Sequence, residues 1–333
     1  MTRTLPGFSA TQLLRAVSPT TPGPAPRPHG RAERRRDRLF RLLRVVAALA
    51  GAGAAAGLQA APPVAERFPE PRLALFYTDV SEAELDSPAG AAVRGSEYAL
   101  DVAPLPWQRA GGLQVGLSYD YVHQEFAGIS GEARDLHRLF FPLRWTSAGD
   151  GRDWRVQLNP GIATSSNKFK RWDRLDSDDF LLTGSWIMRW RRPEGPTWVV
   201  GVAGDHSFGA FRFYPVIGAR LHPGPRWRID ALFPRPALEY SPGERLALGL
   251  GAEPAGGQWN VLSRALDRDL RFRREAWRAQ GYARWNLGHR LWLHFRAGLE
   301  FDRKFDVSDT AGRRVVTGLE SAWTAGVGLT LER

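Results

Sequence analysis

The sequence predicts an all-β protein, a transmembrane antiparallel up-and-down β-barrel of about 14 strands, with about 12 as the alternative count. Three observations predict it. Apolar and polar residues alternate along many segments of about ten residues, as they do in a wall with one face in lipid. An export signal precedes these segments, and no window after it has the roughly 18 apolar residues of a membrane-spanning helix. The composition agrees, because 35 Gly, 13 Trp and 17 Phe occur in a chain with a mean hydropathy of −0.35.

The N-terminal part predicts a disordered or helical region that is removed on export. Residues 1–30 are rich in Pro and poor in apolar residues, so we expect a disordered extension there. Residues 31–60 predict a cleaved signal peptide: seven arginines lie between Arg31 and Arg44, an apolar stretch follows, and Ala60 supplies the small residue of a cleavage site. The alternative is a basic tail followed by a membrane-tethering helix.

The rest of the chain, 61–333, is expected to form the barrel domain in the bacterial outer membrane. Removing residues 1–60, with their ten Arg and two acidic residues, lowers the net charge from +11 to +3. We therefore expect no nucleic acid as a partner, because most of the basic excess lies in the part that is removed. The absence of Cys suits a chain that crosses an oxidising periplasm.

The clearest alternation lies in 275–287 and 290–303, which the turn Gly288-His289 joins into a hairpin. In both segments every second residue is apolar or small and the residues between are mostly polar, which is the period of a strand and not of a helix. We expect the polar register to face the interior. We expect the apolar register to face lipid: Trp277, Ala279, Ala283, Trp285, Leu287, Leu291, Leu293, Phe295, Ala297, Leu299 and Phe301.

Further segments complete the expected wall. In chain order they are 72–79, 95–105, 112–125, 136–147, 152–165, 178–191, 196–207, 211–221, 226–233, 236–241, 244–262 and 316–332. Pro234 and Pro236 would also fit a single bent strand in place of 226–233 and 236–241, and this possibility is the reason for the alternative count of about 12 strands. Short connections rich in Gly, Pro and Asp are expected in the periplasm. Longer polar connections are expected outside the cell, at 80–94, 126–135, 166–177, 263–274 and 304–315.

Two stretches of this chain are similar to a known group of proteins. They are Leu232-Phe233-Pro234-Arg235-Pro236, followed by Glu239-Tyr240, and Leu250-Gly251-Ala252-Glu253-Pro254-Ala255-Gly256-Gly257-Gln258-Trp259. On these residues the chain resembles an uncharacterised outer-membrane β-barrel protein family of Gram-negative bacteria, a domain of unknown function. The resemblance covers most of the chain after the signal, and it implies a barrel in the outer membrane with no established activity, substrate or cofactor. The chain departs from the usual ending of such barrels, because Leu331-Glu332-Arg333 replaces the terminal aromatic residue that the assembly machinery reads.

The polar register of several strands contains charged or titratable residues that we expect to line the lumen. They are Arg155, Arg228, Asp230, Arg278, Arg284, His294, Arg296 and Glu300. One interpretation is a cationic constriction that selects small anionic solutes. The interpretation that we favour is a set of internal salt bridges that fills a narrow barrel, because acidic partners occur on the same strands.

Two other groups of residues are candidates for chemistry. Asp205, His206 and Ser207 are the nearest approach to a catalytic relay, but neighbouring residues of a strand point to opposite faces of the sheet. No His or Cys spacing indicates a metal, and no nucleotide-binding loop is present, so we expect no cofactor. We expect a solvated extracellular loop, rather than a cation site, at an acidic run without calcium-loop spacing: Asp173, Asp176, Asp178 and Asp179.

We therefore expect an outer-membrane barrel of unknown specific role, a narrow channel or a structural barrel with an Arg-containing lumen, and no enzyme. The alternatives are an outer-membrane lipid-modifying enzyme with a site at the extracellular rim, and a soluble secreted β-protein that binds carbohydrate. The expected partners are outer-membrane lipid and lipopolysaccharide, the barrel-assembly machinery during insertion, and small anionic solutes.

Overall fold

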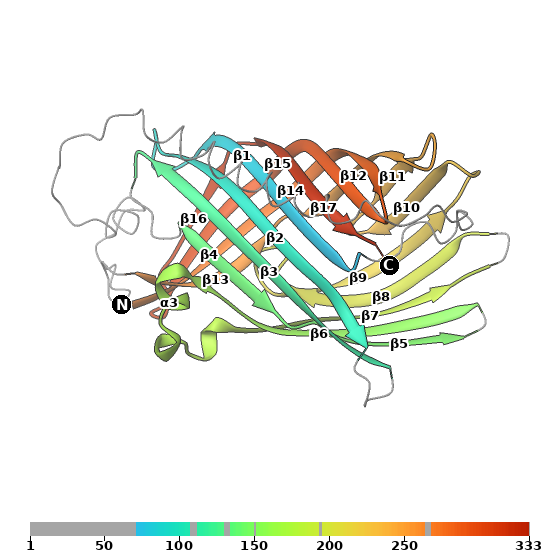
Figure 1. The fold of residues 1–333 in the computed structure, drawn as a ribbon. Coiled ribbons are helices and arrows are strands. Elements are labelled where there is room, and N and C mark those ends of the chain that lie inside the picture. The colour runs from blue at the N-terminus through green and yellow to red at the C-terminus, as the bar shows by residue number, and fades with distance from the viewer. Residues whose placement is uncertain are drawn as a thin grey trace, which may run out of the picture.

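The computed structural model of the chain describes residues 71–106, 112–129, 134–149, 151–192, 195–263 and 268–332. The expected disordered extension and signal peptide lie outside the described residues. The described part is one β-barrel with a short helix, α3 (Ser166–Phe169), at one end (Figure 1). We call this end the α3 end. The opposite end, where the C-terminus and several short strand connections lie, is the turn end.

The sheet contains 17 strands. They are β1 (Leu73–Glu84), β2 (Ala92–Pro106), β3 (Leu113–Ala127), β4 (Asp135–Phe140), β5 (Leu143–Gly149), β6 (Arg152–Ser165), β7 (Phe180–Trp190), β8 (Thr197–Asp205), β9 (Arg212–Leu221), β10 (Trp227–Phe233), β11 (Ala237–Tyr240), β12 (Leu246–Pro254), β13 (Gly257–Ser263), β14 (Arg268–Gly288), β15 (Leu291–Asp309), β16 (Arg314–Leu319) and β17 (Ala322–Leu331). Two short 3-10 helices follow α3, namely η2 (Trp172–Arg174) and η3 (Ser177–Asp179).

The 17 strands occupy 14 positions in the wall, because β4 and β5 share one position, as do β12 and β13 and also β16 and β17. Both members of each pair hydrogen-bond the same neighbour: β4 and β5 lie along β3, β12 and β13 along β14, and β16 and β17 along β15. β17 pairs with β1, so the sheet closes and leaves no free edge. The predicted antiparallel barrel of about 14 strands is confirmed, and β10 and β11 are separate strands.

The outer face of the wall is apolar. Trp285 and Phe295 of the predicted lipid-facing register are 55% and 51% exposed, and Trp323 of β17 is 71% exposed. A barrel surrounded by water would not leave such a continuous set of large apolar side chains uncovered, whereas lipid covers them. Among the described residues no helix has the length and apolar composition needed to cross a membrane.

Two of the expected extracellular loops, 263–274 and 304–315, are largely strand, so this prediction was wrong. β14 and β15 continue beyond their predicted limits toward the α3 end. The charged side chains that indicated loops pair across the two strands, as Arg273 does with Asp306 at 3.2 Å. Alternate residues such as Phe272 are buried. High charge is therefore compatible with a strand when the charged side chains have partners on the neighbouring strand.

The barrel narrows toward the α3 end. Asn260 of β13 pairs in parallel with Thr164 of β6, and the Thr164 hydroxyl donates a hydrogen bond of 2.9 Å to the Asn260 carbonyl. At the turn end β7 to β11 lie between β6 and the position that β12 and β13 share. These five strands end before the level of the contact between Thr164 and Asn260. At the α3 end β13 takes their place beside β6, so the ring contains fewer strands. We call the β6–β13 contact the seam.

The interior at the α3 end is filled with apolar side chains, which we call the apolar plug. The rings of Phe272 and Phe305 lie 5.1 Å apart, and Trp259 is 1% exposed. Phe126 of β3 contacts Phe305 of β15, and because these strands are not neighbours in the wall the two side chains meet across the interior. The expectation of a polar interior is wrong at this end, because a narrow ring brings opposite walls into side-chain contact. The plug consists of Leu85, Ala91, Val93, Val122, Leu136, Ala163, Trp259, Val261, Phe272, Phe305 and Leu319.

Candidate functional site

A layer of charged side chains lies next to the apolar plug, on the side of the turn end, and we call it the ion layer. It consists of Glu97 on β2, Arg274 and Arg278 on β14, and Glu300 and Arg303 on β15. Arg278 Nη2 lies 2.8 Å from Glu97 Oε2 and 2.5 Å from Glu300 Oε1. Arg274 also pairs with Glu97, and Arg303 Nε lies 3.2 Å from Glu300 Oε2. The layer therefore brings the predicted lumen residues Arg278 and Glu300 together.

The ion layer spans the interior of the barrel. β2 and β14 are separated in the wall by β1, β17 and β15, so Arg274 and Arg278 reach Glu97 through the interior and not along the wall. Glu300 is 0% exposed, and the three arginines are buried. A buried charge is tolerated when it is paired, and removing one partner of such a pair costs about 3–5 kcal/mol. The layer therefore ties opposite sides of the barrel together below the plug.

Three more predicted lumen residues form ion pairs nearer the turn end. Asp230 on β10 is buried between two arginines, with Arg228 Nη2 at 3.0 Å and Arg220 Nε at 2.6 Å. Arg284 Nη2 on β14 lies 3.0 Å from Glu239 Oε2 on β11. Sequence reasoning missed Arg220 and Glu239 as partners. Both occupy the polar register of predicted strands, so the period-two pattern contained the signal.

Two of the other predicted lumen residues, His294 and Arg296, make contacts of a different kind. His294 is buried and shares a hydrogen bond of 2.8 Å with Thr330 Oγ1. The Arg296 guanidinium lies 3.8 Å from the centroid of the Phe76 ring, and no carboxylate of the described residues comes within 4.0 Å of it. Arg155 lies on β6, two residues before Gln157, which lines the cavity described next.

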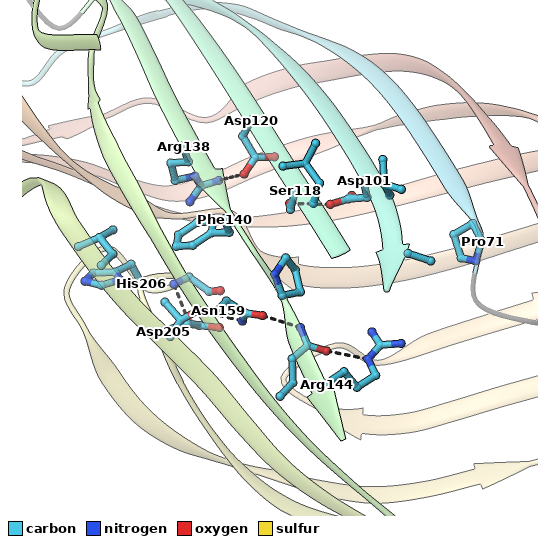
Figure 2. A pocket seen from close by; sticks show the side chains of 18 residues that line it. Pro71, Asp101, Ser118, Asp120, Arg138, Phe140, Arg144, Asn159, Asp205 and His206 are labelled. Atoms are coloured by element: carbon cyan, nitrogen blue, oxygen red, sulfur yellow. Dashed lines mark hydrogen bonds and ion pairs between the residues drawn. The ribbon is translucent and has the colours of Figure 1, made fainter. Parts of the chain in front are cut away.

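A cavity of about 370 Å³ lies in the interior along β2 to β8 (Figure 2). It extends from Pro71, which precedes β1 at the turn end, to Asp205, His206 and Ser207 at the end of β8. Most of the residues that line it are polar or charged, and apolar atoms supply the larger part of its surface. The residues labelled in Figure 2 are Pro71, Asp101, Ser118, Asp120, Arg138, Phe140, Arg144, Asn159, Asp205 and His206.

One side of the cavity is a chain of hydrogen bonds along β5, β6 and β7, which we call the amide side. Arg144 Nε donates to Gln157 Oε1 at 3.1 Å, and Gln157 Nε2 donates to Asn159 Oδ1 at 2.8 Å. Asn159 Nδ2 then donates to Thr183 Oγ1 at 3.0 Å. Every bond in the chain points the same way, from the guanidinium to the hydroxyl. Each amide nitrogen has two N–H groups, so the chain engages one of the two in Gln157 and in Asn159.

The other side of the cavity, on β2 to β4, carries carboxylates, and we call it the carboxylate side. Ser118 Oγ donates to Asp101 Oδ1 at 2.6 Å. Arg138 Nη2 lies 3.1 Å from Asp120 Oδ2. The Arg138 guanidinium also lies 5.1 Å from the centroid of the Trp259 ring, so the cavity reaches the base of the apolar plug.

Asp205, His206 and Ser207 do not form a relay. Asp205 accepts hydrogen bonds from the Ser207 backbone N–H at 2.8 Å and from the Tyr214 hydroxyl at 2.7 Å. The His206 ring lies edge-on to Phe211, with 5.4 Å between centroids. Within the described ranges no hydrogen bond joins the His206 ring to the side chain of Asp205 or Ser207. The three residues contribute to the cavity as separate polar groups.

Sequence reasoning did not group the residues of the cavity. Asp120, Gln157 and Asn159 each stand at a polar position of a predicted strand, so their inward direction followed from the alternation. Their proximity to His206 did not follow, because the diameter and cross-section of a closed sheet depend on all its strands together.

The segment 166–179, which contains α3, η2 and η3, covers the seam, and we call it the seam segment. Lys168 is 1% exposed, and its Nζ lies 3.2 Å from Asp176, 2.7 Å from Asp179 and 3.1 Å from Asp269 of β14. Burial opposes the charge of Lys168, but hydrogen bonds to these three carboxylates raise the pKa of its ammonium. Burial likewise opposes the charge of Asp176, but hydrogen bonds from Lys168 and from the Asp178 backbone lower the pKa of its carboxyl.

The expectation of a solvated acidic loop is therefore wrong for Asp179, which is fully buried against Lys168. Lys168, eight residues before Asp176, supplies the positive charge that pairs with part of this acidic run, and Asp269 of β14 contributes a third carboxylate to the same ammonium. In the part of the chain that the structure describes, no group of three or more His, Asp or Glu side chains has the arrangement of a metal site.

No family model matches the chain, and no curated protein matches its sequence. Among solved structures, an outer membrane channel from Pseudomonas putida F1 is 8% identical with a TM-score of 0.36, covering 77% of this chain and 93% of that one. A mutant of the monoaromatic hydrocarbon channel TodX is 8% identical with a TM-score of 0.29, and covers 78% and 89% of the two chains. OpdQ of Pseudomonas aeruginosa is 9% identical with a TM-score of 0.28, and covers 78% and 98%. These values are too low to transfer a function, and the family named by the resemblance stays a prediction.

Proposed function

We propose that the protein is an outer-membrane barrel that is closed to free diffusion in the conformation seen here. The apolar plug is the single observation that carries this proposal, and the ion layer beneath it adds a second obstacle. An apolar constriction excludes water, and ions cannot cross it without losing their hydration. The closed wall and its exposed apolar face support insertion in a membrane, and the predicted export signal supports the outer membrane.

Cell fractionation and gel mobility test the location. We expect the protein to sediment with outer membranes, and to migrate differently on gels before and after heating, because a closed barrel resists detergent unfolding. Recovery in the periplasmic supernatant would contradict the proposal and favour the soluble carbohydrate-binding alternative.

Single-channel recording in planar bilayers tests the closure. Wild-type protein is expected to show no steady conductance. Trp259→Ala removes the largest fully buried side chain of the plug, so openings are expected. Trp323→Ala removes a tryptophan from the lipid-facing wall and is the matched control, for which no openings are expected. A steady, porin-like conductance of the wild type would overturn the proposal.

A second candidate function is a narrow channel for small anionic solutes, and Arg296 favours it. This arginine lies in the interior without a carboxylate within 4.0 Å among the described residues, so it has charge available for a passing anion. In the plug-opened Trp259→Ala background, Arg296→Ala is expected to reduce selectivity for chloride over potassium, measured as a shift of the reversal potential. Arg220→Ala, at an arginine already paired with Asp230, is the control. Equal reversal potentials in all three proteins would remove this function.

A further inference from the structure

We propose that the cavity along β2 to β8 is a binding site for a neutral, polyhydroxylated small molecule of about the size of a monosaccharide. This goes beyond the proposed function, because binding from the turn end requires neither an open plug nor conduction. Three observations carry it: the presence of both hydrogen-bond donors and acceptors around one space, the balance of charge, and an apolar ring placed between the polar groups.

The two sides of the cavity offer different hydrogen-bonding groups, with Arg138 as a further donor on the carboxylate side and Asp205 of β8 as a further acceptor. The amide side presents the second N–H groups of Gln157 and Asn159, because the chain of hydrogen bonds uses only one from each. The carboxylate side presents Asp101 and Asp120, whose oxygens accept hydrogen bonds. A hydroxyl group both donates and accepts. A molecule with several hydroxyls on adjacent carbons therefore matches both sides at once, whereas a purely accepting or purely donating ligand matches one side.

The charges of the cavity disfavour an anion. Three carboxylates line it, at Asp101, Asp120 and Asp205, against two guanidinium groups, at Arg138 and Arg144. Arg138 is engaged with Asp120 at 3.1 Å, so its charge is already neutralised. A phosphate or carboxylate entering this space would meet more negative than positive charge in a setting of reduced dielectric. A neutral ligand avoids this cost.

The size and the apolar surface of the cavity also fit such a molecule. About 370 Å³ lies near the lower end of the range of roughly 300–1,000 Å³ that small-molecule sites occupy. Phe140 projects between the two polar sides, and its ring lies over Gly161 of β6, where an added Cβ would stand 2.3 Å from Phe140 Cδ1. Gly161 therefore leaves the space that the ring occupies. The C–H face of a sugar ring packs on such an aromatic side chain while its hydroxyls reach the polar groups.

Binding is tested on the folded protein in a detergent without a sugar headgroup, with D-glucose as the probe, by saturation-transfer-difference NMR. We expect a saturable signal with a dissociation constant in the millimolar range, that is about −4 kcal/mol. Glucose 6-phosphate is expected to bind at least about tenfold more weakly, because of its charge. Saturable binding of glucose with a weaker response to the phosphate ester supports the proposal.

Two variants test the site itself. Gln157→Ala interrupts the amide side and is expected to weaken binding about tenfold, as expected for the loss of one or two hydrogen bonds. Gln280→Ala removes an interior glutamine that bonds Glu253 outside the cavity, and it is the matched control with unchanged binding. If Gln157→Ala does not fold, Thr183→Val, which keeps the shape of the side chain, replaces it in the binding measurement. Absence of a saturable glucose signal in the wild type, equal binding in Gln157→Ala and Gln280→Ala, or tighter binding of glucose 6-phosphate would each overturn the proposal. None of these outcomes depends on conductance.

Discussion

The two ends of the interior differ although one wall surrounds both. At the α3 end the ring is narrow, and side chains such as Phe126 and Phe305 meet from strands that are not neighbours. At the turn end β7 to β11 enter the wall, the ring is wider, and polar side chains leave a cavity of about 370 Å³. Side chains of fixed length fill a small ring completely but cannot fill a large one. The number of strands at each level therefore decides whether the interior is dry or polar.

The largest effect on this comparison is expected from the ion layer at the border between the two ends. Glu300→Ala would leave Arg278 and Arg303 buried without one of their carboxylates. We expect the free energy of unfolding, measured by urea titration in detergent micelles, to fall by about 3–5 kcal/mol. Glu253→Ala, at an interior glutamate bonded to Gln280, is the control with a small effect. Equal losses in the two variants would show that the layer has no special role.

A somewhat smaller loss is expected from the plug itself. Leu136 is 0% exposed, so Leu136→Ala leaves a space inside the narrow ring. We expect the free energy of unfolding to fall by about 2–5 kcal/mol. Leu182→Ala, on the exposed outer face of β7, is the matched control in the same titration. A loss at Leu182 as large as at Leu136 would mean that lipid-facing packing, and not the plug, dominates stability.

The seam that makes the ring narrow is expected to depend on Lys168. Lys168→Met removes the ammonium and leaves Asp179 buried beside Asp176 and Asp269, so the seam segment should open locally. Hydrogen exchange of 166–179 is expected to become faster while exchange in β8 and β9 stays the same. Lys170→Met, two residues along the same turn, is the control. Unchanged exchange in Lys168→Met would show that the seam does not depend on the ion pairs of Lys168.

The same cluster predicts a dependence on pH. The raised pKa of Lys168 means that its contribution is present at neutral pH and is lost only in strong base, above its usual value of about 10.4. The lowered pKa of Asp176 means that its contribution is present above about pH 3.9 and is lost as the pH falls through its lowered value. Exchange in the seam segment, corrected for the intrinsic rate, is therefore expected to be constant from about pH 5 to 9 and to rise in acid. A rise centred near pH 6 would contradict this assignment.

The smallest effect on stability is expected at the wide end. Thr183→Val removes one hydrogen bond at the end of the amide side, where the cavity leaves neighbouring groups access to water. We expect a loss of about 0.5–1.5 kcal/mol in the urea titration. A loss as large as that of Leu136→Ala would show that the wide end is as tightly coupled as the narrow one.

The wall could be predicted from the sequence, and the interior could not. The strand period is local, so the directions of Trp285 and Phe295 followed from their immediate neighbours. The seam joins Thr164 to Asn260, and no local pattern reports a contact between residues so far apart in the chain. In 257–261 Trp259 and Val261 occupy one register and Gln258 and Asn260 the other, so the period-two rule indicated an outward Trp259, whereas this side chain is buried in the plug. Lys168 and Asp269 likewise meet only because the seam brings β13 and β14 beside the seam segment.

The exceptional length of β14 and β15 has a consequence for where the protein is blocked. They have 21 and 19 residues, whereas about 9–11 residues cross a bilayer. We therefore expect roughly half of each strand to extend beyond the hydrocarbon layer. On β14 the outward residues Arg271, Arg273 and Glu275 precede Trp277, and we expect this tryptophan to mark the level where lipid begins. Because Phe272 lies beyond that level, we expect the obstruction to be surrounded by water and not by acyl chains. Brominated lipids should therefore quench the fluorescence of a single-tryptophan variant that keeps Trp323 and leave one that keeps Trp259 bright.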